Sequence, residues 1–284
     1  MTQKKIAWIT DSTVLLTDEL KNHPDVYVVP LTVSVQNRVY EDGVDLTTDQ
    51  LYEIINNEKE IPKTSQPSVG KFNELYEKLK GEYEVGIAVH ISSKLSGTLS
   101  SSAAGAEMAG FNVETVDSLI MSSGISDLIE MGIRMQEANT DYKIIAQALR
   151  EETKKNENYI LLGNLDQFYK GGRMSGTQFL LGNILQIKPI IRIHEGAFEL
   201  FEKVRSEKKA TKRLMELLDE AYKNYQILEV HVLHANVLEK AKAYADQILS
   251  NYPKMKVRIG ELTSTISVHC GEGTIALTWR KQPK

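Results

Sequence analysis

The residues best suited to chemistry follow a buried strand in the first half of the chain. Val85 to Ile91 is an almost continuous apolar run, which predicts a strand covered on both faces. Directly after it come hydroxyl and glycine residues, namely Ser92, Ser93, Ser96, Gly97 and Thr98. They lead into a small-residue helix, whose free N–H groups and positive dipole end favour an anion site. Capping of that helix is the simpler alternative, but one cap needs one hydroxyl.

Two other polar stretches lie beside predicted strands or loops. Asp11, Ser12 and Thr13 end the strand predicted at residues 6–10, and they either cap the next helix or face the ligand edge of the sheet. Thr64 and Ser65 lie in a loop between two prolines, which make the loop rigid. Neither hydroxyl has an evident structural duty, although solvent exposure explains either one taken singly.

His269 opens the segment H-C-G-E-G-T, which is predicted as a turn between two strands. Its imidazole and the backbone N–H groups nearby could instead face a ligand. Ser96 and His269 could also act as nucleophile and base, but no third acid is evident and the strained G-x-S-x-G elbow is missing. A hydrolase or acyltransferase that depends on these two residues therefore stays open as an alternative.

Composition and missing motifs argue against several other classes. The 284 residues are 42% hydrophobic and 25% charged, as in a soluble globular protein, and the net charge of −4 argues against nucleic-acid binding. Scattered histidines and the lack of a Walker or G-x-G-x-x-G motif predict neither a metal nor a cofactor. A single cysteine, no signal peptide and no apolar span of about 20 residues predict a cytoplasmic protein.

The elements that must position these residues indicate an α/β protein. Strand and helix patterns alternate from residue 5 to about 155, which predicts a mainly parallel sheet. After a charged stretch, a hairpin signal at 188–204 and amphipathic helices at 207–225 and 237–252 predict a mixed sheet with helices. Gly171 and Gly172 should turn the chain and place Arg173 at the start of another helix. We therefore predict two α/β domains, an N-terminal Rossmann-like domain at 1–157 and a C-terminal domain at 158–284.

Six short motifs, taken in order, resemble the DegV family. They are T-D-S-T at 10–13, T-S-Q-P-S at 64–68, S-S-K-L-S-G-T at 92–98, K-G-G-R-M-S at 170–175, G-N-I-L-Q-I-K-P-I at 182–190 and H-x-G-x-G-T at 269–274. Each motif is weak alone, whereas the ordered set spans essentially the whole chain. The family is similar to the fatty-acid-binding subunit of bacterial fatty acid kinase.

This resemblance implies a carrier rather than an enzyme. Two α/β domains would hold one long-chain fatty acid in a tunnel between or within them. A separate ATP-dependent kinase subunit would phosphorylate the bound carboxylate, and the acyl-phosphate would enter phospholipid synthesis. An acyltransferase of that synthesis and a transient contact with the membrane surface are further partners that the resemblance allows. Transport of another amphiphile, such as a lipid precursor or a retinoid, is the remaining alternative.

The resemblance also implies which residues form the site. The carboxylate-binding positions are Thr64, Ser96 and His269, and Arg173 matches an arginine near the head group. By a looser match, Arg205 would contact the head group or the partner kinase. The supporting loop residues are Ser65, Ser93, Gly97 and Thr98.

One residue departs from the family pattern close to the site. Glu272 stands where the family usually has a proline. Its charge could weaken anion binding, change the pKa of His269 or point to solvent. We expect it to point to solvent.

Overall fold

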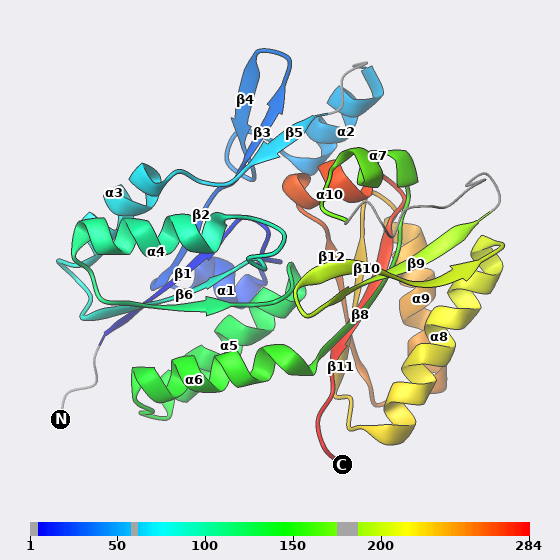
Figure 1. Ribbon diagram of the computed structural model, residues 1–284. Coiled ribbons are helices and arrows are strands. Elements are labelled where there is room, and N and C mark those ends of the chain that lie inside the picture. Colours follow the sequence, from blue (N-terminus) through cyan, green and yellow to red (C-terminus); the bar gives the residue numbers. More distant parts are fainter. Residues whose placement is uncertain (1–4, 58–61, 175–186) are drawn as a thin grey trace. The chain divides into compact units, whose positions relative to one another are not determined.

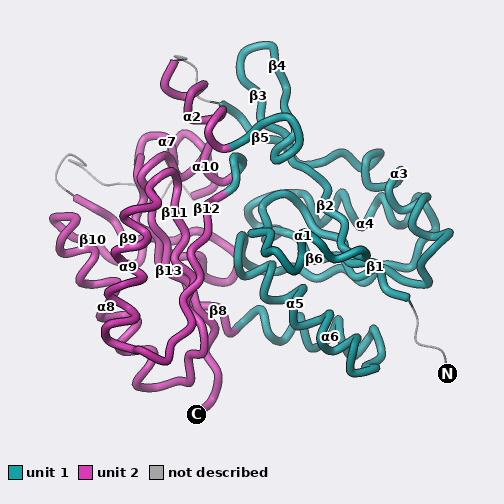
Figure 2. Tube along the Cα trace, turned by 180° about the vertical axis from the view of Figure 1, so that it is seen from behind, with its two compact units in different colours: residues 1–47, 62–154, 263–265 teal, residues 48–61, 155–262, 266–284 magenta. Residues whose placement is uncertain are grey.

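The computed structural model describes residues 5–57, 62–174 and 187–284 (Figure 1), and the chain divides into two compact units. Unit 1 comprises Met1–Thr47, Pro62–Lys154 and Thr263–Thr265, and unit 2 comprises Thr48–Ile61, Lys155–Leu262 and Ile266–Lys284 (Figure 2). The main changeover, between Lys154 and Lys155, lies close to the predicted boundary at residue 157. Each unit also contains a short segment from the other side of that boundary.

Unit 1 is built on a four-stranded parallel sheet in the order β2-β1-β6-β7. The strands are β1 (Ile6–Asp11), β2 (Val26–Val29), β6 (Val85–His90) and β7 (Val113–Asp117). Figure 1 shows α3 (Val69–Leu79) and α4 (Thr98–Ala109) over one face and α5 (Ser123–Glu137) and α6 (Tyr142–Glu152) over the other. The predicted parallel sheet is confirmed, and the carboxyl ends of its strands share one edge.

Alternation along β1 sends neighbouring side chains into opposite layers. Ile9 packs in a cluster with Phe72 and Tyr76 of α3. Trp8 is fully buried on the other face, where a Cβ at Gly132 of α5 would lie 2.2 Å from the indole ring. A β-strand buried on both faces explains why this segment is apolar at almost every position.

A three-stranded antiparallel sheet in the order β4-β3-β5 completes unit 1. Its strands are β3 (Thr32–Val35), β4 (Arg38–Glu41) and β5 (Lys63–Ser65). Pro30 separates β2 from β3, and the two strands belong to different sheets. The predicted loop around Thr64 was partly wrong, since it contains β5.

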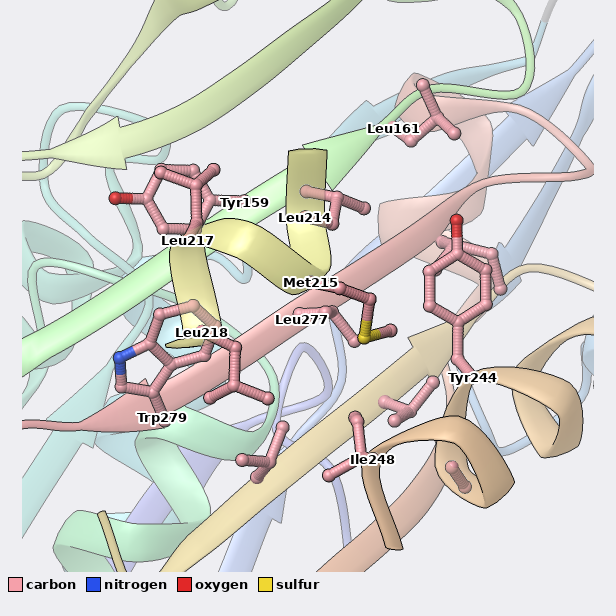
Figure 3. Packing of buried hydrophobic residues seen from close by; sticks show 14 of the residues in the cluster. Tyr159, Leu161, Leu214, Met215, Leu217, Leu218, Tyr244, Ile248, Leu277 and Trp279 are labelled. Atoms are coloured by element: carbon pink, nitrogen blue, oxygen red, sulfur yellow. The ribbon is translucent and has the colours of Figure 1, made fainter. Parts of the chain in front are cut away.

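Unit 2 is built on a six-stranded mixed sheet in the order β10-β9-β8-β13-β11-β12. The strands are β8 (Asn156–Leu161), β9 (Lys188–His194), β10 (Ala197–Val204), β11 (Glu229–His234), β12 (Lys256–Glu261) and β13 (Ile275–Arg280). Among the described strands of this sheet, only the pairing of β11 with β12 is parallel. Side chains of α8 (Glu207–Asn224) and α9 (Leu238–Asn251) pack against this sheet in one apolar cluster (Figure 3). The mixed sheet and its hairpin are confirmed.

The remaining helices of the chain are short. They are α1 (Asp18–Asn22), α2 (Thr48–Asn57), the 3₁₀ turn η1 (Thr153–Lys155), α7 (Leu165–Lys170) and α10 (Ser264–Cys270). α7 and α10 were not predicted, and His269 lies in α10 rather than in a turn. The helix predicted after Arg173 falls on residues 175–186, outside the described residues. Within the described ranges, no helix is long and apolar enough to span a membrane.

Candidate functional site

The polar residues at the end of β1 bind other parts of unit 1. Asp11 is fully buried, accepts hydrogen bonds from Thr13 N at 3.0 Å and Ile91 N at 2.9 Å, and its Oδ2 lies 3.0 Å from Nδ1 of the buried His90. Burial alone would raise the pKa of Asp11, but the hydrogen bonds from His90 and Thr13 outweigh it, so the pKa lies below its usual value. Asp11 thereby fixes the backbone where the serine-rich loop begins.

Ser12 has a similar internal role. Its hydroxyl donates to Asp42 Oδ2 at 3.1 Å and accepts from Leu31 N at 3.0 Å. The same Asp42 oxygen accepts from Thr265 N at 3.1 Å. The next helix, α1, is capped by Thr17, so the predicted cap at residues 11–13 was wrong.

Ser96 and Thr98 form a hydroxyl pair at the amino end of α4. Their side-chain oxygens lie 2.8 Å apart; Thr98 is fully buried, whereas Ser96 is partly exposed. The N-cap residue is Gly97, and no side chain caps the helix. Neither hydroxyl therefore caps the helix. Together with the positive end of the helix dipole, the two hydroxyls favour binding of an anion.

Ser93 connects the same loop to β7. Its Oγ donates to Asp117 Oδ2 at 2.5 Å, and its N–H donates to the other carboxylate oxygen at 3.2 Å. These two bonds between the exposed Ser93 and the half-buried Asp117 order the start of the loop. Ser93 thus contributes to the shape of the loop that carries Ser96.

Gln66 connects the T-S-Q-P-S segment to the start of α4. Its Nε2 donates to Ser101 Oγ at 2.7 Å, and its amide lies over Gly97, where a Cβ would be 2.1 Å from Gln66 Oε1. Thr64 lies two residues earlier in β5, paired with Val33, and the exposed Ser65 follows it. The structure therefore brings the motifs of Thr64 and Ser96 together within unit 1.

In unit 2, the K-G-G-R turn after α7 folds against the imidazole of His269. A Cβ at Gly171 would lie 2.5 Å from His269 Nδ1, so position 171 requires glycine. The exposed Arg173 donates from Nη1 to the carbonyl of Gly171 at 2.6 Å, and Gly172 has φ +68°. The structure thus brings Arg173 and His269 into one part of unit 2.

Buried polar side chains hold α10 in place. Gln167 of α7 donates from Nε2 to the carbonyls of Ser267 at 3.3 Å and Val268 at 2.6 Å. The hydroxyl of Tyr52, from α2, donates to Ser267 Oγ at 2.9 Å. Both contacts were missed in the sequence, because an isolated Gln or Tyr in a short helix leaves no periodic signal.

The surroundings keep His269 uncharged at neutral pH. Burial first, and the positive charge of Arg173 second, lower the pKa of His269 to about 4. A neutral imidazole can donate one hydrogen bond to an anion, and the guanidinium supplies positive charge close by. Glu272 is exposed and accepts from Asn236 Nδ2 at 2.7 Å, so it points to solvent as expected.

One predicted residue, Arg205, lies outside these groups. Arg205 is exposed directly after β10, and its contact with a ligand or partner stays a prediction. A cavity of about 500 Å³ in unit 2 is lined by residues that include Tyr222, Leu228, Met255 and Lys284. No residue assigned to the candidate site lines this cavity. Over residues 5–57, 62–174 and 187–284, no group of three or more His, Cys, Asp and Glu side chains could hold a metal.

The fold and these residues define a class of α/β protein. A parallel-sheet unit with a hydroxyl-rich helix start is joined to a mixed-sheet unit with a buried, neutral histidine. The family model described as "Uncharacterised protein, DegV family" matches residues 5–282, and the chain belongs to the DegV family.

Known relatives match over nearly their whole length. A DegV domain-containing protein of Listeria innocua is 35% identical over 278 residues, which cover 97% of this chain and 98% of the relative. The crystal structure of DegV, a fatty acid binding protein from Bacillus subtilis, has a TM-score of 0.88 and 31% identity, with 98% of this chain and 100% of that chain covered. A fatty acid binding DegV family protein from Streptococcus agalactiae has a TM-score of 0.91 and 29% identity, covering 98% and 99%.

A more distant structure shares the fold alone. It is the fatty acid kinase B3 protein of Streptococcus pneumoniae loaded with linoleic acid, with a TM-score of 0.85, 20% identity and coverage of 98% and 100%.

Proposed function

We propose that this protein binds one long-chain fatty acid in a buried tunnel and presents the carboxylate to a separate ATP-dependent kinase. It acts as a carrier and not as a catalyst, and the acyl-phosphate product serves phospholipid synthesis. The observation that carries the proposal is the likeness over 98% of this chain to the B. subtilis protein whose structure is described as fatty acid binding, at 31% identity. The two groups of polar residues support it.

The energetics of a fatty acid fit such a carrier. Burying an alkyl chain stabilises the complex by about 0.8 kcal/mol per methylene, so roughly sixteen carbons contribute on the order of 10 kcal/mol. A buried carboxylate costs free energy unless hydrogen bonds replace its water. We assign Thr64 and Ser96 of unit 1 and His269 of unit 2 to those bonds, with Arg173 near the head group.

The proposed kinase step needs a partner. The chain has no Walker loop, so ATP would be bound by the kinase subunit. A carboxylate oxygen of the fatty acid would attack the γ-phosphorus of ATP, and ADP would leave. Arg205, which is exposed, is assigned to the phosphorylated head group or to the kinase surface. Support for this step comes from the motif resemblance.

The alternative of a Ser96–His269 hydrolase has less support. A general base works best with a pKa near the operating pH, whereas burial lowers the pKa of His269 to about 4. Purified protein should therefore leave an activated acyl ester unchanged when no partner is present. Turnover that Ser96→Ala abolishes would favour the hydrolase or acyltransferase.

The first test is mass spectrometry of the organic extract of denatured protein purified from a bacterial host. We expect a near-stoichiometric long-chain fatty acid. A different amphiphile would favour the other carrier alternative. An empty extract, with no uptake of added fatty acid, would contradict fatty acid binding altogether.

Matched variants test the assigned residues. Ser96→Ala and His269→Ala should each weaken fatty acid binding about tenfold, because each removes a hydrogen bond to a charged group. Ser100→Ala and His194→Ala, at exposed positions, are the controls. Unchanged fatty acid binding in both site variants would contradict the assignment.

The kinase step is tested separately. Adding the kinase subunit and ATP should yield acyl-phosphate, and the carrier alone should yield none.

A further inference from the structure

We infer that Gln66 is a positioning residue that sets Thr64 relative to Ser96, and that Gly97 is glycine to admit the Gln66 amide. The inference rests on the proposed function, because it concerns the two hydroxyls assigned to the carboxylate. The residues involved come from two motifs, T-S-Q-P-S and S-G-T, that are separated by about thirty residues.

The contact has two parts. At one end of the amide, Gln66 Nε2 donates to the hydroxyl of Ser101, which is only 5% exposed. At the other end, Oε1 occupies the place of a side chain at Gly97, since a Cβ there would lie only 2.1 Å away. Ser101 N donates to the carbonyl of Gly97 at 3.0 Å, so the Gln66 side chain spans the first turn of α4. Ser96 directly precedes Gly97, the N-cap residue of that turn.

Thr64 depends on this contact because its own strand is short. β5 has three residues and pairs with β3 alone among the described strands. Gln66 follows β5 directly, and Pro67 restricts Gln66 to extended backbone. The amide therefore holds β5, which carries Thr64, at a fixed position relative to α4. Loss of the contact would leave both hydroxyls in place on their own elements but no longer held at a set spacing.

A merely structural surface bond makes a different prediction. Gln66 is exposed, and a hydrogen bond of this kind contributes little to the stability of the fold. If that were its whole role, variants would shift the unfolding midpoint slightly and leave fatty acid affinity unchanged. If Gln66 positions the hydroxyls, affinity falls while the midpoint hardly moves.

A double-mutant cycle separates these possibilities. Gln66→Ala removes the amide, and Gly97→Ala displaces it, so both act on one contact. We expect each to weaken palmitate binding about tenfold, and the double variant to be no weaker than either single one. Gln147→Ala and Gly70→Ala are controls, since Gln147 is exposed on α6 and a Cβ at Gly70 meets nothing closer than 3.8 Å.

The outcomes are distinct. Unchanged affinity in both single variants, or a double variant with roughly hundredfold, additive loss, would overturn the inference. If wild-type protein binds no fatty acid, the proposed function fails first. If wild-type protein binds fatty acid and the Gln66 and Gly97 variants bind it equally well, the proposed function stands and the positioning role of Gln66 is wrong.

Discussion

At the scale of single residues, His269 shows how burial selects the form of a titratable group. Its pKa is lowered to about 4, mainly by burial and then by Arg173. At neutral pH the imidazole is therefore neutral rather than cationic, and it would serve the proposed ligand as a hydrogen-bond donor. Positive charge stays on the exposed guanidinium of Arg173, so in the proposed site hydrogen bonding and charge compensation would come from two different side chains.

The same shift makes stability depend on pH. The unfolded chain binds a proton on His269 near pH 6.5, and the folded chain only near pH 4. The stability that this group contributes is complete above pH 6.5 and is lost as the pH falls toward 4, since the unfolded state takes up the proton first. In urea denaturation, His269→Gln should lose less unfolding free energy than wild type between these pH values. Equal losses would contradict the assigned shift.

Gly171 gives a second prediction at this scale. Gly171→Ala would place a methyl group 2.5 Å from His269 Nδ1, so the imidazole must move. We expect weaker fatty acid binding and a changed His269 titration by NMR. Gly81→Ala is the control, because it also follows a helix end and its Cβ meets nothing closer than 3.6 Å. A Gly171 variant with the wild-type titration would show that the turn does not constrain His269.

At the scale of elements, α3 and α4 pack closely because α4 has glycine where the helices meet. A Cβ at Gly105 would lie 2.6 Å from Phe72 Cβ and 2.9 Å from Asn73 N. Gly105→Ala should lower the unfolding free energy by about 1–3 kcal/mol, because the backbone of α3 must shift. Gly70→Ala on α3 has room and should be neutral or stabilising by up to about 1 kcal/mol. Urea denaturation measures both, and equal effects would contradict the packing account.

Elements with a strong local pattern were predictable from sequence, and those fixed by distant contacts were not. The apolar run of β6 and the amphipathic stripe of α8 predicted those elements directly. α10 has β-branched residues and no helical stripe, and it is held by Gln167 and Tyr52 from elsewhere in the chain.

The residues of the candidate site also fall into those with a local sequence signal and those whose role depends on distant contacts. Ser96, Thr64 and His269 were singled out by residue type and motif, and their contact with a ligand stays a prediction. Gln66 and Gln167, which hold their surroundings, were missed because their roles arise only when separate segments meet. The sequence did offer one signal, since Gln66 lies inside a motif already singled out, between Thr64 and Pro67.

At the scale of the whole molecule, the predicted domain boundary can be tested with fragments. Fragment 1–157 would contain Tyr52 and Asp42, whose partners Ser267 and Thr265 lie beyond it. Both side chains are buried in the full chain, and each loses one hydrogen bond in the fragment, at a cost of about 0.5–1.5 kcal/mol apiece. We expect the fragment to unfold at lower urea concentration than the full chain, and fragment 158–284 to restore the loss. An identical midpoint without the second fragment would support an autonomous domain.

The path of the chain also limits how this protein can be recombined with its relatives. Unit 2 is made of three separate segments, and the backbone passes from one unit to the other five times. A chimaera that takes unit 2 from another DegV protein must therefore replace three stretches and preserve five junctions. One of those junctions falls inside α10, between Thr265 and Ile266, in the helix that carries His269. Exchanging the C-terminal half at a single crossover would mix parts of both parents within each unit.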